Sequence, residues 1–241
     1  MYEFITARSG KWSLVVFSFL SVVSVSLCLS GLINRNISCL PSAIIFILLA
    51  GLAFLFHNRS EIRIWRSLPG KLDSKSALSI ELFAVYVFLL ILHIIFDWPL
   101  THMLASVAGI IYLISLDNIY SSSSESSLTR FHSGQTFLTA LIMTSFFVSA
   151  LWPFIFIGTI KLAYILYSIL KRDAGSNFFV LRFVRAALLF IVAMILLTGE
   201  GRGTIISYVI FITGELCDRI TFYIDFLPTD TKNTDSKNIT L

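Results

Sequence analysis

Charged residues are scarce in this chain. Of its 241 residues only 13% are Asp, Glu, Lys or Arg, whereas 56% are hydrophobic, and the mean hydropathy is +0.86. Soluble domains carry about 25% charged residues, so a water-soluble fold of this size would lack the polar groups that its surface needs. The apolar runs are continuous and long enough to cross about 30 Å of hydrocarbon as helices. We therefore predict an all-α fold, a polytopic transmembrane bundle of about eight helices.

Cysteine is also rare, and the three cysteines, Cys28, Cys39 and Cys217, are scattered. None forms a C-x-x-C pair or has the spacing of a zinc or iron–sulfur site, so we interpret them as small buried apolar residues. His93 and His102 are single histidines in apolar runs, which are more often packed or hydrogen-bonded than haem ligands. We therefore expect no metal, haem or cluster in this chain. Ser-His-Asp and H-E-x-x-H motifs are missing too, which argues against a self-contained enzyme of those classes.

The hydrophobic residues gather in eight runs. They cover residues 12–33, 39–56, 80–97, 99–116, 135–151, 153–170, 178–198 and 204–224. The stretch from Thr136 to Leu170 would be about 52 Å long as one helix, which is too long for a bilayer. Trp152-Pro153 supplies a break, because proline disfavours helix in the residue before it, so we predict two short helices joined tightly there. Residues 1–228 form the predicted bundle, and the polar segment 229–241 is predicted to be a disordered tail.

The basic residues lie mainly between these runs, on alternate connections. The segments 57–79 and 171–177 are rich in Lys and Arg, whereas the opposite connections hold Arg35 and Arg202 and little else. By the positive-inside rule, both termini then face the cytoplasm. This orientation signal accounts for the net charge of +4 and the pI near 9.0. No basic stretch has the density of a nucleic-acid-binding patch, so we predict the lipid bilayer and no nucleic acid as a partner.

A few charged residues lie inside the runs, where a charge is costly and is a functional candidate by default. Glu215 and Arg219 are four residues apart, hence on one face of a helix, and we predict that they form an intramembrane ion pair. Asp218 is expected to point elsewhere. Lys161 lies in the middle of its run without a local partner, and either snorkels or meets a carboxylate on another helix.

His57 closes the second run and Glu81 opens the third, with one loop between them. Both residues should therefore lie at the same membrane face. An imidazole can hydrogen-bond a ring oxygen and a carboxylate can accept a proton, so the pair could bind and deprotonate a small hydroquinone. The alternative is that each residue merely caps or anchors a helix end.

Three segments carry a resemblance to a known family. The first contains His57, the Arg-containing aromatic stretch Arg63–Leu68 and Leu78-Ser79-Ile80-Glu81. The second is the closing segment Gly214–Tyr223, which reads G-E-L-C-D-R-I-T-F-Y, and the third and weaker one extends from Thr129 to Leu141. In these motifs, in its size class and in its eight predicted helices, the chain resembles the membrane-anchor subunit family of dimethyl sulfoxide reductase.

Anchors of that family oxidise menaquinol and pass its electrons to an iron–sulfur subunit and then to a molybdopterin catalytic subunit. The resemblance therefore implies a subunit of an anaerobic respiratory oxidoreductase in the bacterial inner membrane, with menaquinol as substrate and no catalysis on its own. His57 and Glu81 would be the quinol-binding groups, with Glu81 as the catalytic base. Glu215, Arg219 and Tyr223 match the closing motif and would be structural or quinol-adjacent.

Arg63, Trp65 and Arg66 lie in the segment that joins His57 to Glu81. A soluble electron acceptor has to approach the quinol site, and interfaces favour Arg and aromatic anchors, so we expect this segment to dock the iron–sulfur subunit. Two other functions stay open. A small-solute transporter or channel would need helix breaks that face each other at mid-membrane. A purely structural membrane anchor would lack the quinol site. The turn after His57 agrees with that alternative, because Asn58, Arg59 and Glu61 stand where the family usually has Leu-Gly and a nearby proline.

Overall fold

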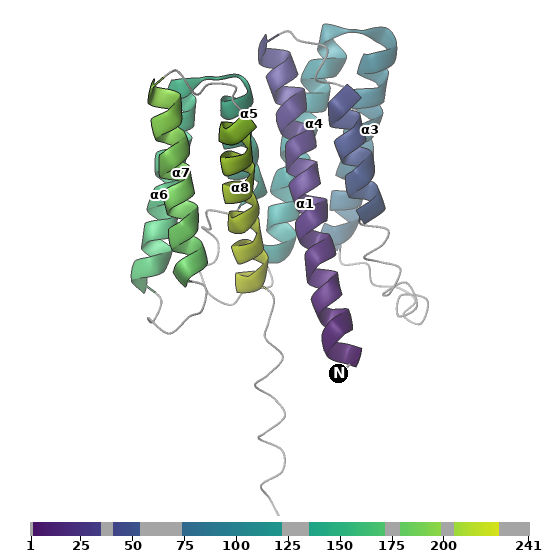
Figure 1. Ribbon diagram of the computed structural model, residues 1–241. Helices are drawn as coiled ribbons and strands as arrows, with labels where there is room; N and C mark the ends of the chain where they lie inside the picture. The colour runs from purple at the N-terminus through teal and green to yellow at the C-terminus, as the bar shows by residue number, and fades with distance from the viewer. Residues whose placement is uncertain are drawn as a thin grey trace, which may run out of the picture.

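The computed structural model describes residues 2–34, 41–53, 74–121, 135–171, 179–198 and 205–226. Within these ranges the chain is all-helical, with no strand, which confirms the predicted fold class at that level (Figure 1). The helices are α1 (Tyr2–Asn34), the helix Pro41–Ala53, α3 (Ser74–Phe96), α4 (Pro99–Ser121), α5 (Thr136–Phe147), α6 (Leu151–Lys171), α7 (Phe179–Thr198) and α8 (Ile205–Phe226). The predicted tail 229–241 lies outside the described residues.

Three of these helices contain segments that are long and apolar enough to cross a membrane, namely Val15–Asn34, Leu78–Phe96 and Pro99–Asn118. Four more helices contain shorter apolar segments: Pro41–Ala53, Thr136–Phe147, Leu151–Tyr167 and Phe183–Ile195. Seven of the eight predicted runs therefore coincide with apolar helices, and the eighth coincides with α8. The main difference in extent is in α1, which begins at Tyr2, ten residues before the predicted start.

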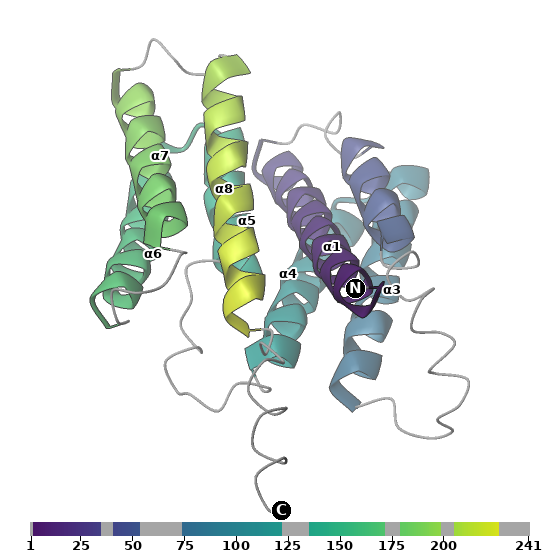
Figure 2. The ribbon, with the colours of Figure 1, turned by 60° about the horizontal axis from the view of Figure 1, so that its bottom comes forward.

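The helices pack side by side in one bundle around α1. Figures 1 and 2 show α6, α7 and α8 on one side of α1, and α3 and the helix Pro41–Ala53 on the other, while α1 itself contacts α4, α5 and α8. The start of α1 and the end of α8 lie at the same end of the bundle. We call it the basic end, because the helices next to the Lys- and Arg-rich segments 57–79 and 171–177 begin or end toward it.

The predicted break in the long apolar stretch exists, but it lies earlier than Trp152-Pro153. α5 ends at Phe147 and α6 begins at Leu151, with Ser149 in the left-handed region at φ 56°. The Phe154 amide donates to the Ala150 carbonyl at 3.1 Å, which starts the new helix. Pro153 thus lies in the first turn of α6, where its missing N–H costs no helical hydrogen bond. Proline begins the second helix here and does not end the first.

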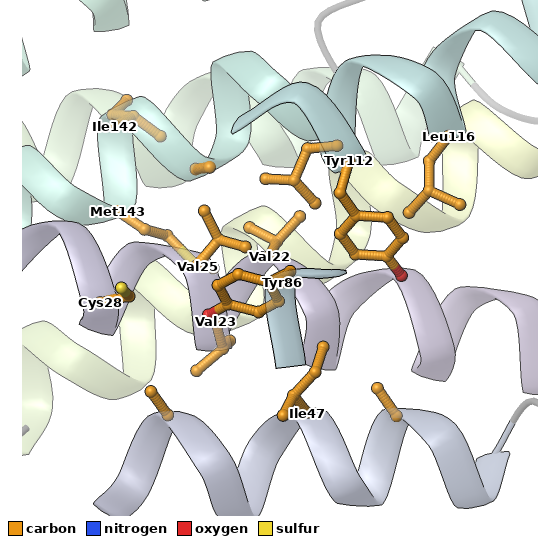
Figure 3. Close-up of a cluster of buried hydrophobic side chains, with 14 of the residues drawn as sticks. Val22, Val23, Val25, Cys28, Ile47, Tyr86, Tyr112, Leu116, Ile142 and Met143 are labelled. Atoms are coloured by element: carbon orange, nitrogen blue, oxygen red, sulfur yellow. The ribbon is translucent and has the colours of Figure 1, made fainter. Parts of the chain in front are cut away.

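Buried hydroxyl groups on α1 join the core of the bundle. Ser21 and Ser24 lie 3.0 Å from the hydroxyls of Tyr112 and Tyr86 respectively, so α1 is bonded to both α4 and α3. Figure 3 shows these two tyrosines among the apolar side chains around α1. A Cβ at Gly109 would lie 3.0 Å from the Val25 side chain, so only glycine allows α4 this close. Small residues let helices approach closely, and the bonded hydroxyls avoid the cost of unsatisfied buried polar groups.

Candidate functional site

Glu81 lies in the body of α3 and not at its start, so the prediction that it opens the helix is wrong. α3 begins at Ser74, because the polar residues before the apolar run also adopt the helix. The Glu81 side chain is exposed, and its neighbours Leu78, Ile80 and Val85 are exposed as well. A carboxylate therefore stands on the outward, apolar face of α3, about 10 Å along the helix from the basic end.

Glu81 differs in this respect from the other carboxylates whose side chains the structure describes. Asp97 lies in the turn between α3 and α4, Asp117 is partly buried, and Glu215 and Asp218 are buried. Glu81 alone among them stands on the outer surface of an apolar segment. A charged group at such a position would be costly in hydrocarbon, which makes Glu81 a candidate site residue.

The helix Pro41–Ala53, which precedes His57, packs on α3 at the level of the turn that carries Glu81, but on another face of α3. There the Cβ position of Gly51 lies 3.6 Å from the ring of Phe83. Phe83 is two residues from Glu81, and His57 follows Gly51 by six residues in the sequence. His57 itself lies outside the described residues.

The residues proposed to dock a partner, Arg63, Trp65 and Arg66, also lie outside the described part of the chain. Tyr223 belongs to α8, but its side chain is not described either. Of the residues predicted to bind quinol or a partner near the basic end, the structure therefore describes only Glu81, together with the packing of the helix Pro41–Ala53 on α3. The other predicted groups, Glu215 and Arg219, lie elsewhere in the bundle, in α8.

Four charged side chains from three helices meet inside the bundle, and we call them the charge cluster: Lys161 of α6, Arg185 of α7, and Glu215 and Asp218 of α8. Each is at most 2% exposed. The Lys161 ammonium lies 2.6 Å from Glu215 Oε2 and 3.0 Å from Asp218 Oδ2. The Arg185 guanidinium donates to Glu215 Oε1 and lies 3.6 Å from Asp218 Oδ2. Each cation thus contacts both carboxylates.

The charge cluster corrects one prediction and extends another. Asp218 does not point away from Glu215, because residues three apart on a helix share a face, and both reach the same two cations. Glu215 bonds to α6 and α7, which the predicted pairing with Arg219 along its own helix did not include. Of the two possibilities for Lys161, the carboxylate on another helix is the one observed.

Sequence reasoning missed Arg185 as a member of the charge cluster. In the sequence Arg185 lies just beyond the basic 171–177 connection and resembles a flanking charge, whereas its side chain is 1% exposed and bonds Glu215. Its position in the sequence could have indicated this role. Arg185 is the seventh residue of an apolar helix, too far from the helix end for its charged group to reach solvent easily. The same depth had already singled out Lys161.

A further helix connects to the charge cluster, since Lys161 donates to the Thr139 hydroxyl of α5 at 3.1 Å. The start of α5 is bonded in turn to α4. There Asp117 accepts hydrogen bonds from the backbone amides of Thr136, at 2.9 Å, and Phe137, at 3.3 Å. These are the otherwise unbonded amides at the start of α5, so Asp117 caps that helix from a neighbour.

His93 and His102 are packed and hydrogen-bonded, as predicted. Their rings stack with centroids 4.5 Å apart and planes 27° apart. The Nδ1 of His93 lies 3.0 Å from the Trp98 carbonyl, and the Nε2 of His102 lies 2.8 Å from the Cys28 carbonyl. The pair therefore ties the α3–α4 turn to α1. Across the described side chains, no group of three or more His, Cys, Asp or Glu is arranged to hold a metal ion.

Comparison of the chain with protein-family models, with curated protein sequences and with solved structures gives no match. The function therefore has to be argued from the residues and their geometry. Two features bear on it, the outward carboxylate of Glu81 on α3 and the buried charge cluster of α6, α7 and α8.

Proposed function

We propose that this chain is a multi-pass membrane subunit in which all eight helices span the bilayer and both termini face the cytoplasm. The outward surface supports this, because large apolar side chains are exposed on helix after helix, for example Phe88, Met103, Phe156, Phe190 and Val209. Water would penalise such a surface, whereas lipid does not. The start of α1 and the end of α8 lie at the same end of the bundle, which agrees with an even number of spans.

Within that class, we propose that the chain anchors a respiratory oxidoreductase and oxidises menaquinol at Glu81 and His57. The observation that carries this proposal is the exposed carboxylate on the apolar face of α3. Menaquinol is dissolved in the bilayer and would reach an outward-facing group laterally, without a channel through the bundle. Its oxidation releases two protons with two electrons, so the site needs a base beside the ring oxygen, and Glu81 supplies one.

His57 would orient the quinol by a hydrogen bond to the second ring oxygen. The packing of Gly51 against Phe83 supports this role only in depth, since it holds the end of the helix Pro41–Ala53 at the level of Glu81 along α3. The electrons would leave to an iron–sulfur subunit at the basic end and continue to a molybdopterin catalytic subunit.

A transporter receives less support. It would need facing helix breaks at mid-membrane, and the break between α5 and α6 lies at the end of the bundle away from the basic end (Figure 1). The charged groups deep in α6, α7 and α8 are paired with one another. They therefore do not offer a vacant solute site.

The proposal is tested by Glu81→Gln in membranes that contain the assembled complex, with oxidation of a menaquinol analogue as the readout. Glutamine keeps the size and the hydrogen bonding of glutamate but is not a base. Because general base catalysis contributes about 10²–10⁴-fold, the rate should fall by at least about 100-fold while the partner subunits still co-purify. Asp97→Asn, at the other end of α3, is the matched control and should keep the native rate. A native rate in Glu81→Gln would leave the purely structural anchor as the function.

The docking role of the 57–79 segment has its own test. Charge reversal at Arg63 and Arg66 should release the iron–sulfur subunit from the membranes, because these residues would face it at the basic end. Charge reversal at Arg202, on the opposite side, is the control. Unchanged co-purification after reversal at Arg63 and Arg66 would place the docking surface elsewhere.

A further inference from the structure

α8 differs from the other helices in its polarity. Three of the other helices contain segments long and apolar enough to cross a membrane and four contain shorter apolar segments, whereas the described part of α8 contains neither. The cause is local, since Glu215, Asp218 and Arg219 place three charges within five residues. The first half of α8, with Ile205, Ile206 and Val209 exposed, is apolar.

The three charges of α8 lie on one face, because positions i, i+3 and i+4 of a helix are neighbours. That face is turned into the bundle, where Glu215, Asp218 and Arg219 are at most 2% exposed. Both carboxylates have their partners on helices that precede α8 in the chain, Lys161 and Arg185. The cations that neutralise the carboxylates of α8 are therefore supplied by α6 and α7.

The close packing of α7 and α8 makes this arrangement specific. A Cβ at Gly214 would lie 3.1 Å from Arg185 Nη1 and 3.3 Å from the Leu188 Cβ. The glycine directly before Glu215 thus lets the Arg185 guanidinium lie against the backbone of α8. Wider spacing would lengthen the contacts of Arg185 with both carboxylates.

We infer that α8 is not a self-sufficient membrane span, and that it enters and stays in the bilayer only as a unit with α6 and α7, held by Lys161 and Arg185. An isolated α8 would bring two carboxylates and one cation, Arg219, into hydrocarbon, which is costly and leaves a net negative charge there. α6 and α7 each carry only one deeply placed charge, Lys161 and Arg185, within a longer apolar stretch. Each of them should therefore insert into the bilayer before α8 is present at a lower cost than α8 would incur alone. The inference rests on the proposed membrane location but not on quinol oxidation.

The test uses the full chain with a topology reporter fused either after Gly175, between α6 and α7, or after the C-terminal Leu241. In the native chain both reporters lie on the same side. In Lys161→Met/Arg185→Met, α8 should fail to insert, so the C-terminal reporter should move to the opposite side in most chains while the Gly175 reporter keeps its side. The control Lys171→Met/Arg182→Met removes the same residue types from the same two helices near their ends and should change neither reporter.

Neutralising α8 in the same background provides the second arm. Adding Glu215→Gln and Asp218→Asn to Lys161→Met/Arg185→Met should return the C-terminal reporter to its native side, because the uncompensated carboxylates are gone. A C-terminal reporter that never moves, or one that moves and is not restored, would overturn the inference. Failure of the membrane proposal itself is distinguishable, because the native chain would then be extracted by alkaline carbonate.

Discussion

Replacing Lys161 by Met tests the energetics of the charge cluster. Methionine has a similar length and an apolar character, so it fills the same space without leaving a cavity. The substitution removes an ammonium that lies 2.6 Å from Glu215, 3.0 Å from Asp218 and 3.1 Å from Thr139. Deleting one partner of a buried ion pair costs about 3–5 kcal/mol, since the remaining charge is left uncompensated.

Arg185 stays in contact with both carboxylates, so the lower bound of that range is the appropriate value. We expect the free energy of unfolding to fall by about 3 kcal/mol, which is roughly 150-fold in the unfolding equilibrium. The measurement is the unfolding of the purified chain in mixed detergent micelles. Lys171→Met, on the same helix but at its end, should change stability by less than about 0.5 kcal/mol.

The double variant Lys161→Met/Glu215→Gln separates charge pairing from packing. It removes one cation and one anion, and leaves Arg185 with Asp218. We therefore expect it to lose less stability than the sum of the two single variants, with a coupling energy of about 1–3 kcal/mol. Strict additivity, or a loss below about 0.5 kcal/mol in Lys161→Met, would refute the reasoning that the cluster holds α6 and α8 together.

Two further predictions concern the arrangement of the helices. Reporter fusions after residues 70, 125 and 175 should all report the cytoplasmic side, because the helices next to these connections begin or end toward the basic end. Opposite signals at 125 and 175 would mean that α5 and α6 are one span. Gly214→Val should lower stability by about 1–3 kcal/mol, since a Cβ there lies 3.3 Å from the Leu188 Cβ, and thermal unfolding checks it against Gly158→Ala, where the nearest atom is 3.8 Å away.

The helices were predictable because each one contains a long apolar run that is visible in the sequence. The helix boundaries were less predictable, because a helix can continue through polar residues beyond the end of its apolar run. α1 continues back to Tyr2 and α3 back to Ser74 through polar residues, which moved Glu81 from the predicted helix start into the helix body. The position of the α5–α6 break was also predicted too late in the sequence. Proline is tolerated in the first turn of a helix, so Pro153 lies just inside α6 and the break precedes it.

The charge cluster was only half predictable. Spacing along α8 placed Glu215 and Arg219 on one face, and the same rule should have included Asp218. The partners of these residues depend on which helices are neighbours, and no local pattern carries that information. Lys161 and Arg185 come from two other helices, and only the packed bundle brings them to Glu215 and Asp218.

The most direct test of the central claim is the binding of a menaquinol analogue to the purified chain in lipid nanodiscs. We predict saturable binding of one analogue per chain in the native protein. Glu81→Ala removes a charge-assisted hydrogen bond worth about 1.5–3 kcal/mol, so affinity should fall by about 10- to 100-fold, while Asp97→Ala should leave it unchanged. No saturable binding by the native chain, or equal affinity in Glu81→Ala, would contradict a quinol site at the outward carboxylate of α3.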